Sequence, residues 1–132
     1  MKTKIKNLSM ILSVVLMASC AKEGLGGDAT LVVFLKHHGH IIVNHVGYPD
    51  TVFVKFNAKE SPGITASKYD TYFVGEEGED HVHCHDLKWG NYFIYGTGID
   101  SSGPYRVNGG IAVKIKRSQR KEEQDVDLAV TE

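Results

Sequence analysis

Short runs of apolar and β-branched residues, separated by Gly, Pro, Asn and Asp, occupy the chain from residue 30 onward. Residues 51–57 (TVFVKFN) alternate between apolar and polar positions, the period of a strand with one buried face. No segment has the period of an amphipathic helix. The pattern therefore predicts strands over residues 30–37, 51–57, 69–74, 81–85, 91–99, 111–117 and 125–130, and residues 41–43 continue the chain after a turn at Gly39.

Six or seven short strands without a helix indicate an all-β domain, and we expect a seven-stranded antiparallel Greek-key sandwich. The last two strands, 111–117 and 125–130, are expected to form a hairpin. The charged residues 114–123 would lie at its tip. Because they mix both signs at close range, they indicate a solvated turn rather than a site for an anionic partner.

The first 19 residues have the layout of a secretory signal. Lys2, Lys4 and Lys6 precede an apolar run over residues 8–17, and small residues follow. The run is about half of the ~20 residues that a membrane-spanning helix needs, although an uncleaved anchor remains an alternative, as does plain secretion. The pattern predicts a signal peptide over residues 1–19, a tether over 20–28 and one domain over 29–132.

The sequence Leu16-Met17-Ala18-Ser19-Cys20 resembles the signal of bacterial lipoproteins. That resemblance implies that Cys20 carries lipid and becomes the first mature residue. Several acyl chains would then hold the protein at a membrane. Ala21 follows the cysteine where an Asp would retain the protein in the inner membrane. We therefore expect a lipid-anchored protein of the cell envelope, in the outer membrane of a Gram-negative bacterium.

The charge balance excludes one class of partner. The chain has 15 Lys or Arg and 16 Asp or Glu residues. Three of the basic residues and none of the acidic ones lie in residues 1–19, so the mature protein is acidic. Nucleic acid binding requires a basic face, and we therefore expect no nucleic acid partner.

A second resemblance lies in residues 82–94, VHCHDLKWGNYFI. This stretch resembles a signature of carboxypeptidase regulatory-like, or transthyretin-like, domains, in which apolar residues, a Leu, a Gly and a Tyr recur at fixed spacing. The matching positions are Val82, Cys84, Leu87, Gly90, Tyr92 and Ile94. The resemblance implies a transthyretin-like or Ig-like sandwich in which Leu87 fills the core and Gly90 permits a tight turn. It implies no activity, because this fold has many functions.

Cys84 has no partner if Cys20 carries lipid. A lone thiol in an oxidising compartment is best explained by burial, because free cysteine behaves as a small apolar residue. A reactive or metal-bound thiol is the alternative.

The seven histidines occupy two zones, residues 37–45 and residues 81–85. Residues two apart on a strand share a face, so His81, His83 and His85 should lie on one side of their strand and Cys84 on the other. Imidazoles on one face can bind zinc or copper, and His38 and His40 could add ligands if their turn lies nearby. Asp80 and Asp86 could orient the imidazoles from outside. A solvated histidine face and a catalytic histidine are the alternatives.

Trp89 lies in the turn of the signature. A tryptophan at a turn could anchor a protein partner, or stack on a sugar together with Tyr92, Phe93, Tyr95 and Tyr105. Alternatively, Trp89 packs back onto the sandwich and the tyrosines belong to the core or to strand faces.

The chain lacks the common catalytic motifs, such as Gly-x-Ser-x-Gly, a phosphate loop or His-Glu-x-x-His. We therefore expect a non-enzymatic accessory or binding module that is anchored to the membrane, needs no cofactor and has a protein or glycan partner. The first alternative is a lipoprotein that binds zinc or copper through its histidines. The second is a glycan-binding module that uses Trp89.

Overall fold

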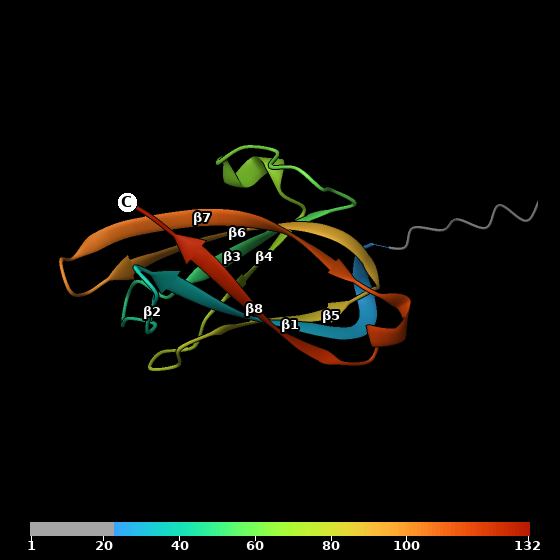
Figure 1. Ribbon diagram of the computed structural model, residues 1–132, viewed down its shortest axis with the longest axis horizontal. Helices are drawn as coiled ribbons and strands as arrows, with labels where there is room; N and C mark the ends of the chain where they lie inside the picture. The colour runs from blue at the N-terminus through green and yellow to red at the C-terminus, as the bar shows by residue number, and fades with distance from the viewer. Residues whose placement is uncertain (1–22) are drawn as a thin grey trace, which may run out of the picture.

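The computed structural model describes residues 23–132 (Figure 1). The predicted signal peptide and Cys20 lie outside the described residues. The described part contains eight strands and two single-turn 3-10 helices. Their bounds are β1 Leu25–His37, β2 His40–Ile41, β3 Thr51–Phe56, η1 Ala66–Lys68, β4 Thr71–Val74, β5 Val82–Leu87, β6 Gly90–Asp100, β7 Tyr105–Ile115, η2 Arg117–Gln119 and β8 Glu123–Val130.

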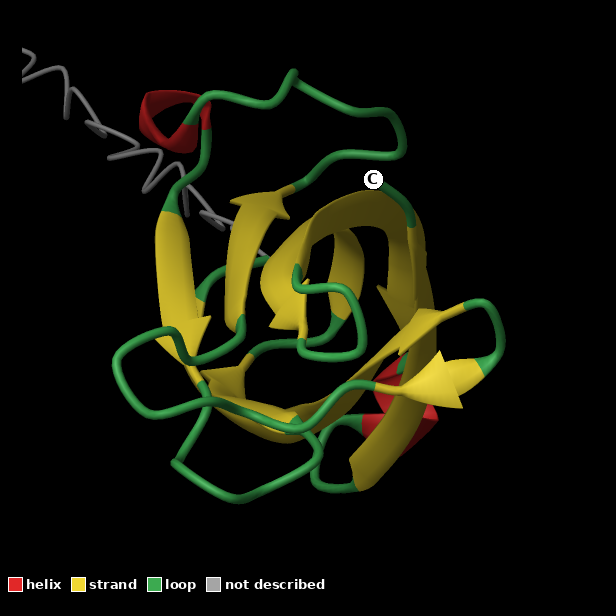
Figure 2. Ribbon diagram, turned by 90° about the vertical axis from the view of Figure 1, so that its left-hand side faces the viewer, coloured by secondary structure: helices red, strands yellow, loops and turns green. Residues whose placement is uncertain are grey.

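Two sheets pack face to face, as Figures 1 and 2 show. In the first sheet, β1 is central. The strand β8 pairs with β1 from Thr30 to His37, so β5 and β2 share the other edge of β1. The second sheet has the order β4-β3-β6-β7 and is antiparallel throughout. The predicted all-β sandwich is therefore confirmed.

The core lies between the sheets. It is made by every second residue along each strand, because side chains alternate between the two faces of a sheet. In β3 the inward residues Val52 and Val54 are fully buried, whereas Lys55, which follows on the outer face, is half-buried. The other fully buried large side chains come from β1, β5, β6, β7 and β8. They are Leu31, Val33, Leu35, Val82, Leu87, Tyr92, Ile94, Val107, Ile115 and Leu128.

The predicted hairpin between residues 111–117 and 125–130 is wrong. The strand β7 pairs with β6 in the second sheet, and β8 pairs with β1 in the first sheet, in parallel. The helix η2 carries the chain from one sheet to the other. In this position Leu128 and Val130 of β8 are buried and close the core beside β1.

The domain begins earlier than the sequence suggests, because β1 starts at Leu25, within the expected tether. The two residues before it are also held. The backbone N–H of Gly24 donates to the hydroxyl of Tyr92 at 2.9 Å, and a carboxylate oxygen of Glu23 accepts from the N–H of Asn91 at 3.1 Å. Within residues 23–132, no helix has the length and hydropathy needed to cross a membrane.

The six signature positions are all buried. Leu87 ends β5 in the first sheet and Gly90 starts β6 in the second, so the turn between them joins the two layers. Gly90 has a φ of 138°, which side chains rarely tolerate. The hydroxyl of Tyr92 donates to the carbonyl of Lys88 at 2.6 Å and so ties the turn to the core. The inward direction expected for Leu87, Tyr92 and Ile94 is confirmed.

Candidate metal centre

The strand β5 presents its two faces as its sequence predicts. Val82 and Cys84 are fully buried, whereas His83 and His85 are exposed on the other face. Burial raises the pKa of the Cys84 thiol far above its ordinary value, which keeps the sulfur protonated and unreactive. Cys84 is therefore a core residue, and the imidazoles are the groups of β5 that are available for chemistry.

His81, His83 and Glu79 converge at the beginning of β5. The Nε2 atoms of His81 and His83 lie 2.9 Å apart, and Oε2 of Glu79 lies 3.2 Å from Nε2 of His81. Two imidazole nitrogens at this distance either share a proton or face a common cation. The ligand atoms of a tetrahedral zinc site with bonds of ~2.0–2.1 Å are about 3.3 Å apart. Two of the three separations are thus already close to the spacing that a bound ion requires, and the ligand atoms of all three residues lie within 4.8 Å of one another.

Carboxylates next to the histidines in sequence hold the far side of two imidazoles. Nδ1 of His81 lies 2.7 Å from Oδ1 of Asp80, and Nδ1 of His85 lies 2.9 Å from Oδ2 of Asp86. A carboxylate that accepts a hydrogen bond from Nδ1 leaves Nε2 with its lone pair free for a metal. The expected contacts of Asp80 and Asp86 with the histidines are present.

A cleft of about 260 Å³ opens between the edges of the two sheets at this point. Its walls are Tyr72, Phe73, Val74 and Gly75 on one side and Glu76, Glu79, His81, His83 and His85 on the other. The imidazole of His85 packs edge-on against Phe73 at 5.3 Å and does not belong to the converging group. The cleft gives solvent or a further ligand access to His83.

Asn44 supports the loop that carries Glu79. Asn44 is only 3% exposed, and its side-chain NH₂ donates to the carbonyl oxygens of Glu79 at 2.9 Å and His81 at 3.2 Å. Its side-chain oxygen accepts from the N–H of Asp50 at 2.7 Å. Asn44 is separated from this loop by 35 residues, and no local pattern in the sequence marks it as a support for the site.

His38 and His40 do not join this group. His38 lies in the turn between β1 and β2, and His40 directly follows it, beyond the point where β1 leaves β5. The ring of His81 contacts Phe34 at 5.6 Å, and His37 lies three residues further along β1, which is about 10 Å in an extended strand. The structure therefore separates the two histidine zones, and it groups His38 with His37 and Glu132 instead.

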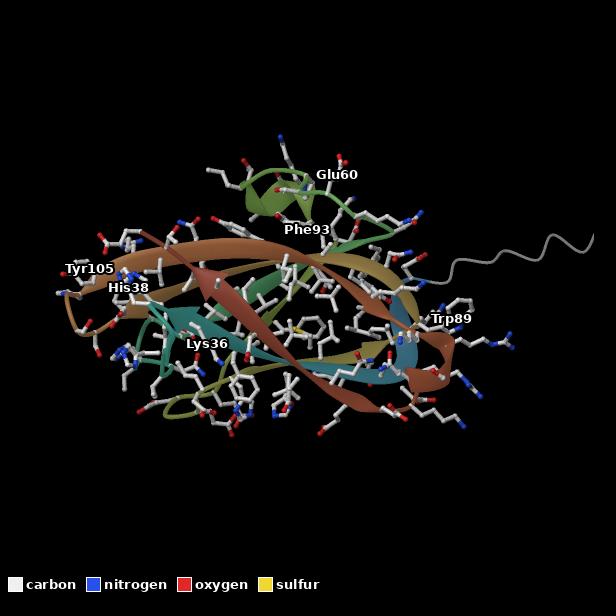
Figure 3. The ribbon with its side chains drawn as sticks, in the orientation of Figure 1. Lys36, His38, Glu60, Trp89, Phe93 and Tyr105 are labelled. Carbon is white, nitrogen blue, oxygen red and sulfur yellow. The ribbon has the colours of Figure 1, made fainter. Side chains whose placement is uncertain are left out.

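Trp89 lies at the end of the sandwich opposite His38 (Figure 3). Its half-buried ring packs against the core, and the guanidinium of Arg117 lies 5.9 Å from the ring centre. Of the tyrosines near it in sequence, Tyr92 is in the core. Tyr95 lies on the outer face of the second sheet, where its ring stacks on that of Tyr69 at 5.9 Å. The aromatic residues therefore do not form one platform around Trp89.

The side chain of Asp50 is an unusual feature near this site, because the residue is 1% exposed and precedes β3. Neither carboxylate oxygen has a hydrogen-bond partner within residues 23–132. Burial disfavours the charged form and raises the pKa of Asp50 from 3.8 to about 7. The native state therefore binds a proton that the unfolded chain has already released above about pH 4.

We expect Asp50 to make the domain less stable as the pH rises from about 4 to about 7, because over this range the unfolded chain releases the proton that the buried carboxyl of the native state keeps. Asp50→Asn keeps the shape of the side chain and cannot ionise. The variant should therefore lose this pH dependence and be the more stable protein at about pH 8. Urea unfolding of both proteins at about pH 5 and about pH 8 measures the difference. Parallel pH profiles for the two proteins would contradict the assignment.

Comparison with known proteins adds no relative from which a function could be transferred. No family model matches the chain, and no curated protein or solved structure matches it either. The fold alone is compatible with many functions. The functional interpretation therefore depends on the side chains of the site itself.

Proposed function

We propose that this protein is a lipid-anchored envelope protein that binds a divalent transition-metal ion through Glu79, His81 and His83. The observation that supports this most directly is the approach of their three ligand atoms to within 4.8 Å of one another. The lipoprotein-like signal around Cys20 supports the membrane anchor and the location in the envelope. The binding module expected from the sequence then has an inorganic ligand.

The types of ligand atom favour zinc or copper(II). Imidazole suits both ions, and a carboxylate oxygen suits a divalent ion better than copper(I), which prefers soft sulfur ligands. The sulfur of Cys84 is buried on the opposite face of β5. The three methionines of the chain, Met1, Met10 and Met17, all lie in the predicted signal peptide. With Cys20 carrying lipid, the mature protein therefore offers no free sulfur to this site.

The accessibility of the site supports capture and release of the ion rather than a structural role. Structural zinc sites have four protein ligands, whereas Glu79, His81 and His83 provide three and leave one position for water or a ligand from a partner. His83 is exposed, and the cleft reaches it. The core of the sandwich is complete without an ion, as the buried residues on both sheets show. We therefore propose that the domain holds metal at the envelope in exchangeable form.

Calorimetry with zinc tests this function. Replacing both His81 and His83 by alanine should remove one equivalent of bound zinc per chain, and with it the rise in melting temperature that the ion gives by binding the native state. Binding should also weaken in acid, because a protonated imidazole cannot bind a metal ion. Copper(II) should give the same pattern.

The matched control is His85→Ala, which removes an imidazole from the same face of the same strand. Because His85 lies outside the converging group, this variant should keep the zinc equivalent. The proposal is contradicted if the double variant binds as much zinc as the wild-type protein.

A further inference from the structure

A second histidine, His37, is held more rigidly than those of β5. It is the last residue of β1 and is 3% exposed. Its Nδ1 lies 2.6 Å from Oδ2 of Asp100, and the other oxygen of Asp100 accepts from the N–H of Ser102 at 2.9 Å. A carboxylate that accepts a hydrogen bond from Nδ1 leaves Nε2 as the coordinating atom of the ring.

Two more ligand groups surround the other side of this imidazole. Oε1 of Glu132 lies 3.8 Å from Nε2 of His37, and the ring of His38 lies 4.1 Å from the ring of His37. The ligand atoms of the three residues lie within 4.8 Å of one another. The side chain of Glu132 is 56% exposed, so a shift of about 0.5 Å would bring it to the spacing of a tetrahedral site.

The turn between β1 and β2 explains why His38 can take part. His38 has a φ of 49° and Gly39 a φ of 79°, the pattern of a two-residue turn in which both residues are left-handed. Histidine is one of the few residues with a side chain that tolerates this conformation. The tight turn keeps His38 directly beside His37.

We propose that His37, His38 and Glu132 form a second site for a divalent transition-metal ion, with Asp100 orienting His37 from outside. The site uses the same donor types as Glu79, His81 and His83, namely two imidazole nitrogens and one carboxylate oxygen. It lies at a different place, where the end of β1, the turn after it and the residue beyond the end of β8 meet. The other interpretation of the geometry is an ion-pair network in which a protonated His37 lies between Asp100 and Glu132 and binds no metal.

Zinc stoichiometry decides between these interpretations. The full chain, purified in detergent and titrated with zinc alone, should bind two equivalents. The His81→Ala, His83→Ala protein should bind one. Adding His38→Asn and Glu132→Gln to that protein should abolish binding, and neither change should unfold it, because asparagine tolerates a positive φ and Glu132 is exposed. Adding His45→Asn instead is the matched control and should leave the one equivalent intact.

The outcomes separate this site from the first one. If the His81→Ala, His83→Ala protein binds no zinc while the wild type binds one equivalent, the second site is overturned and the function proposed for the first is supported. If His38→Asn with Glu132→Gln removes the one equivalent that the wild type binds, the second site stands and the first fails. Unchanged binding in the protein that carries all four changes would overturn the second site.

Discussion

Replacing Leu87 by alanine should lower the free energy of unfolding by about 2–5 kcal/mol, the usual cost of truncating a buried leucine. Leu87 is fully buried at the point where the chain passes from the first sheet to the second. The backbone of β1 lies against it, because Leu25 and Ala29 both pair with Leu87. A Cβ at Gly27 would collide with the carbonyl of Leu87. The paired backbone fixes the position of Leu87, so the cost of the truncation reports the loss of its side chain from the core.

Leu25→Ala is the matched control, because Leu25 is the same residue type on the neighbouring strand and is 48% exposed. Its truncation should cost less than half as much. Urea unfolding at neutral pH measures both variants. A change below about 0.5 kcal/mol for Leu87→Ala, the scale of surface substitutions, would contradict the placement of this side chain in the core.

Asn44→Ala should affect stability and metal binding together. The change removes the acceptor of the Asp50 N–H and the donor to the carbonyl of His81, in a place where water cannot replace them. We expect a loss of about 2–4 kcal/mol in the free energy of unfolding. The loop that carries Glu79 would also lose its support, so zinc affinity at the first site should fall about 10–100-fold, as it does when groups that orient ligands are removed.

Asn108→Ala is the control for this experiment, because it truncates the same type of side chain at an exposed position of β7. It should leave both the unfolding midpoint and the zinc affinity of the first site nearly unchanged. Calorimetry of Asn44→Ala has to be performed well below its unfolding temperature, so that weaker binding reports the folded site. Wild-type zinc affinity at the first site in Asn44→Ala would show that the loop needs no such support.

The alternation of apolar and polar residues predicted most strands, because it reports directly which face of a strand is buried. Residues 51–57 are an example, since Val52 and Val54 of β3 point into the core of the sandwich. The partner of each strand could not be predicted in the same way. The residues of β8 alternate equally well beside β7 or beside β1, and the choice depends on which sheet edge needs to be closed. That choice is a property of the whole sandwich and not of the local sequence.

Of the candidate site, only the part that follows from the alternation of side chains along a strand, here called parity, could be predicted. Parity placed His83 and His85 on the face opposite Cys84, and the structure agrees. It could not identify Glu79, which lies outside β5 in a loop that Asn44 holds from a distant part of the chain. Nor could it select His37, whose burial and contact with Asp100 depend on the pairing of β1 with its neighbours and on the length of β6.

The parallel pairing of β1 and β8 has a mechanical consequence. The two strands run in the same direction and are paired residue by residue from Thr30 with Glu123 to His37 with Val130. A pull between the start of β1 and the end of β8 would therefore slide the strands along each other and load all of their hydrogen bonds at once. Bonds loaded in this way share the force, whereas bonds at the end of a hairpin open one after another. The pairing of β1 with β8 is therefore arranged to resist tension applied between the two ends of the domain.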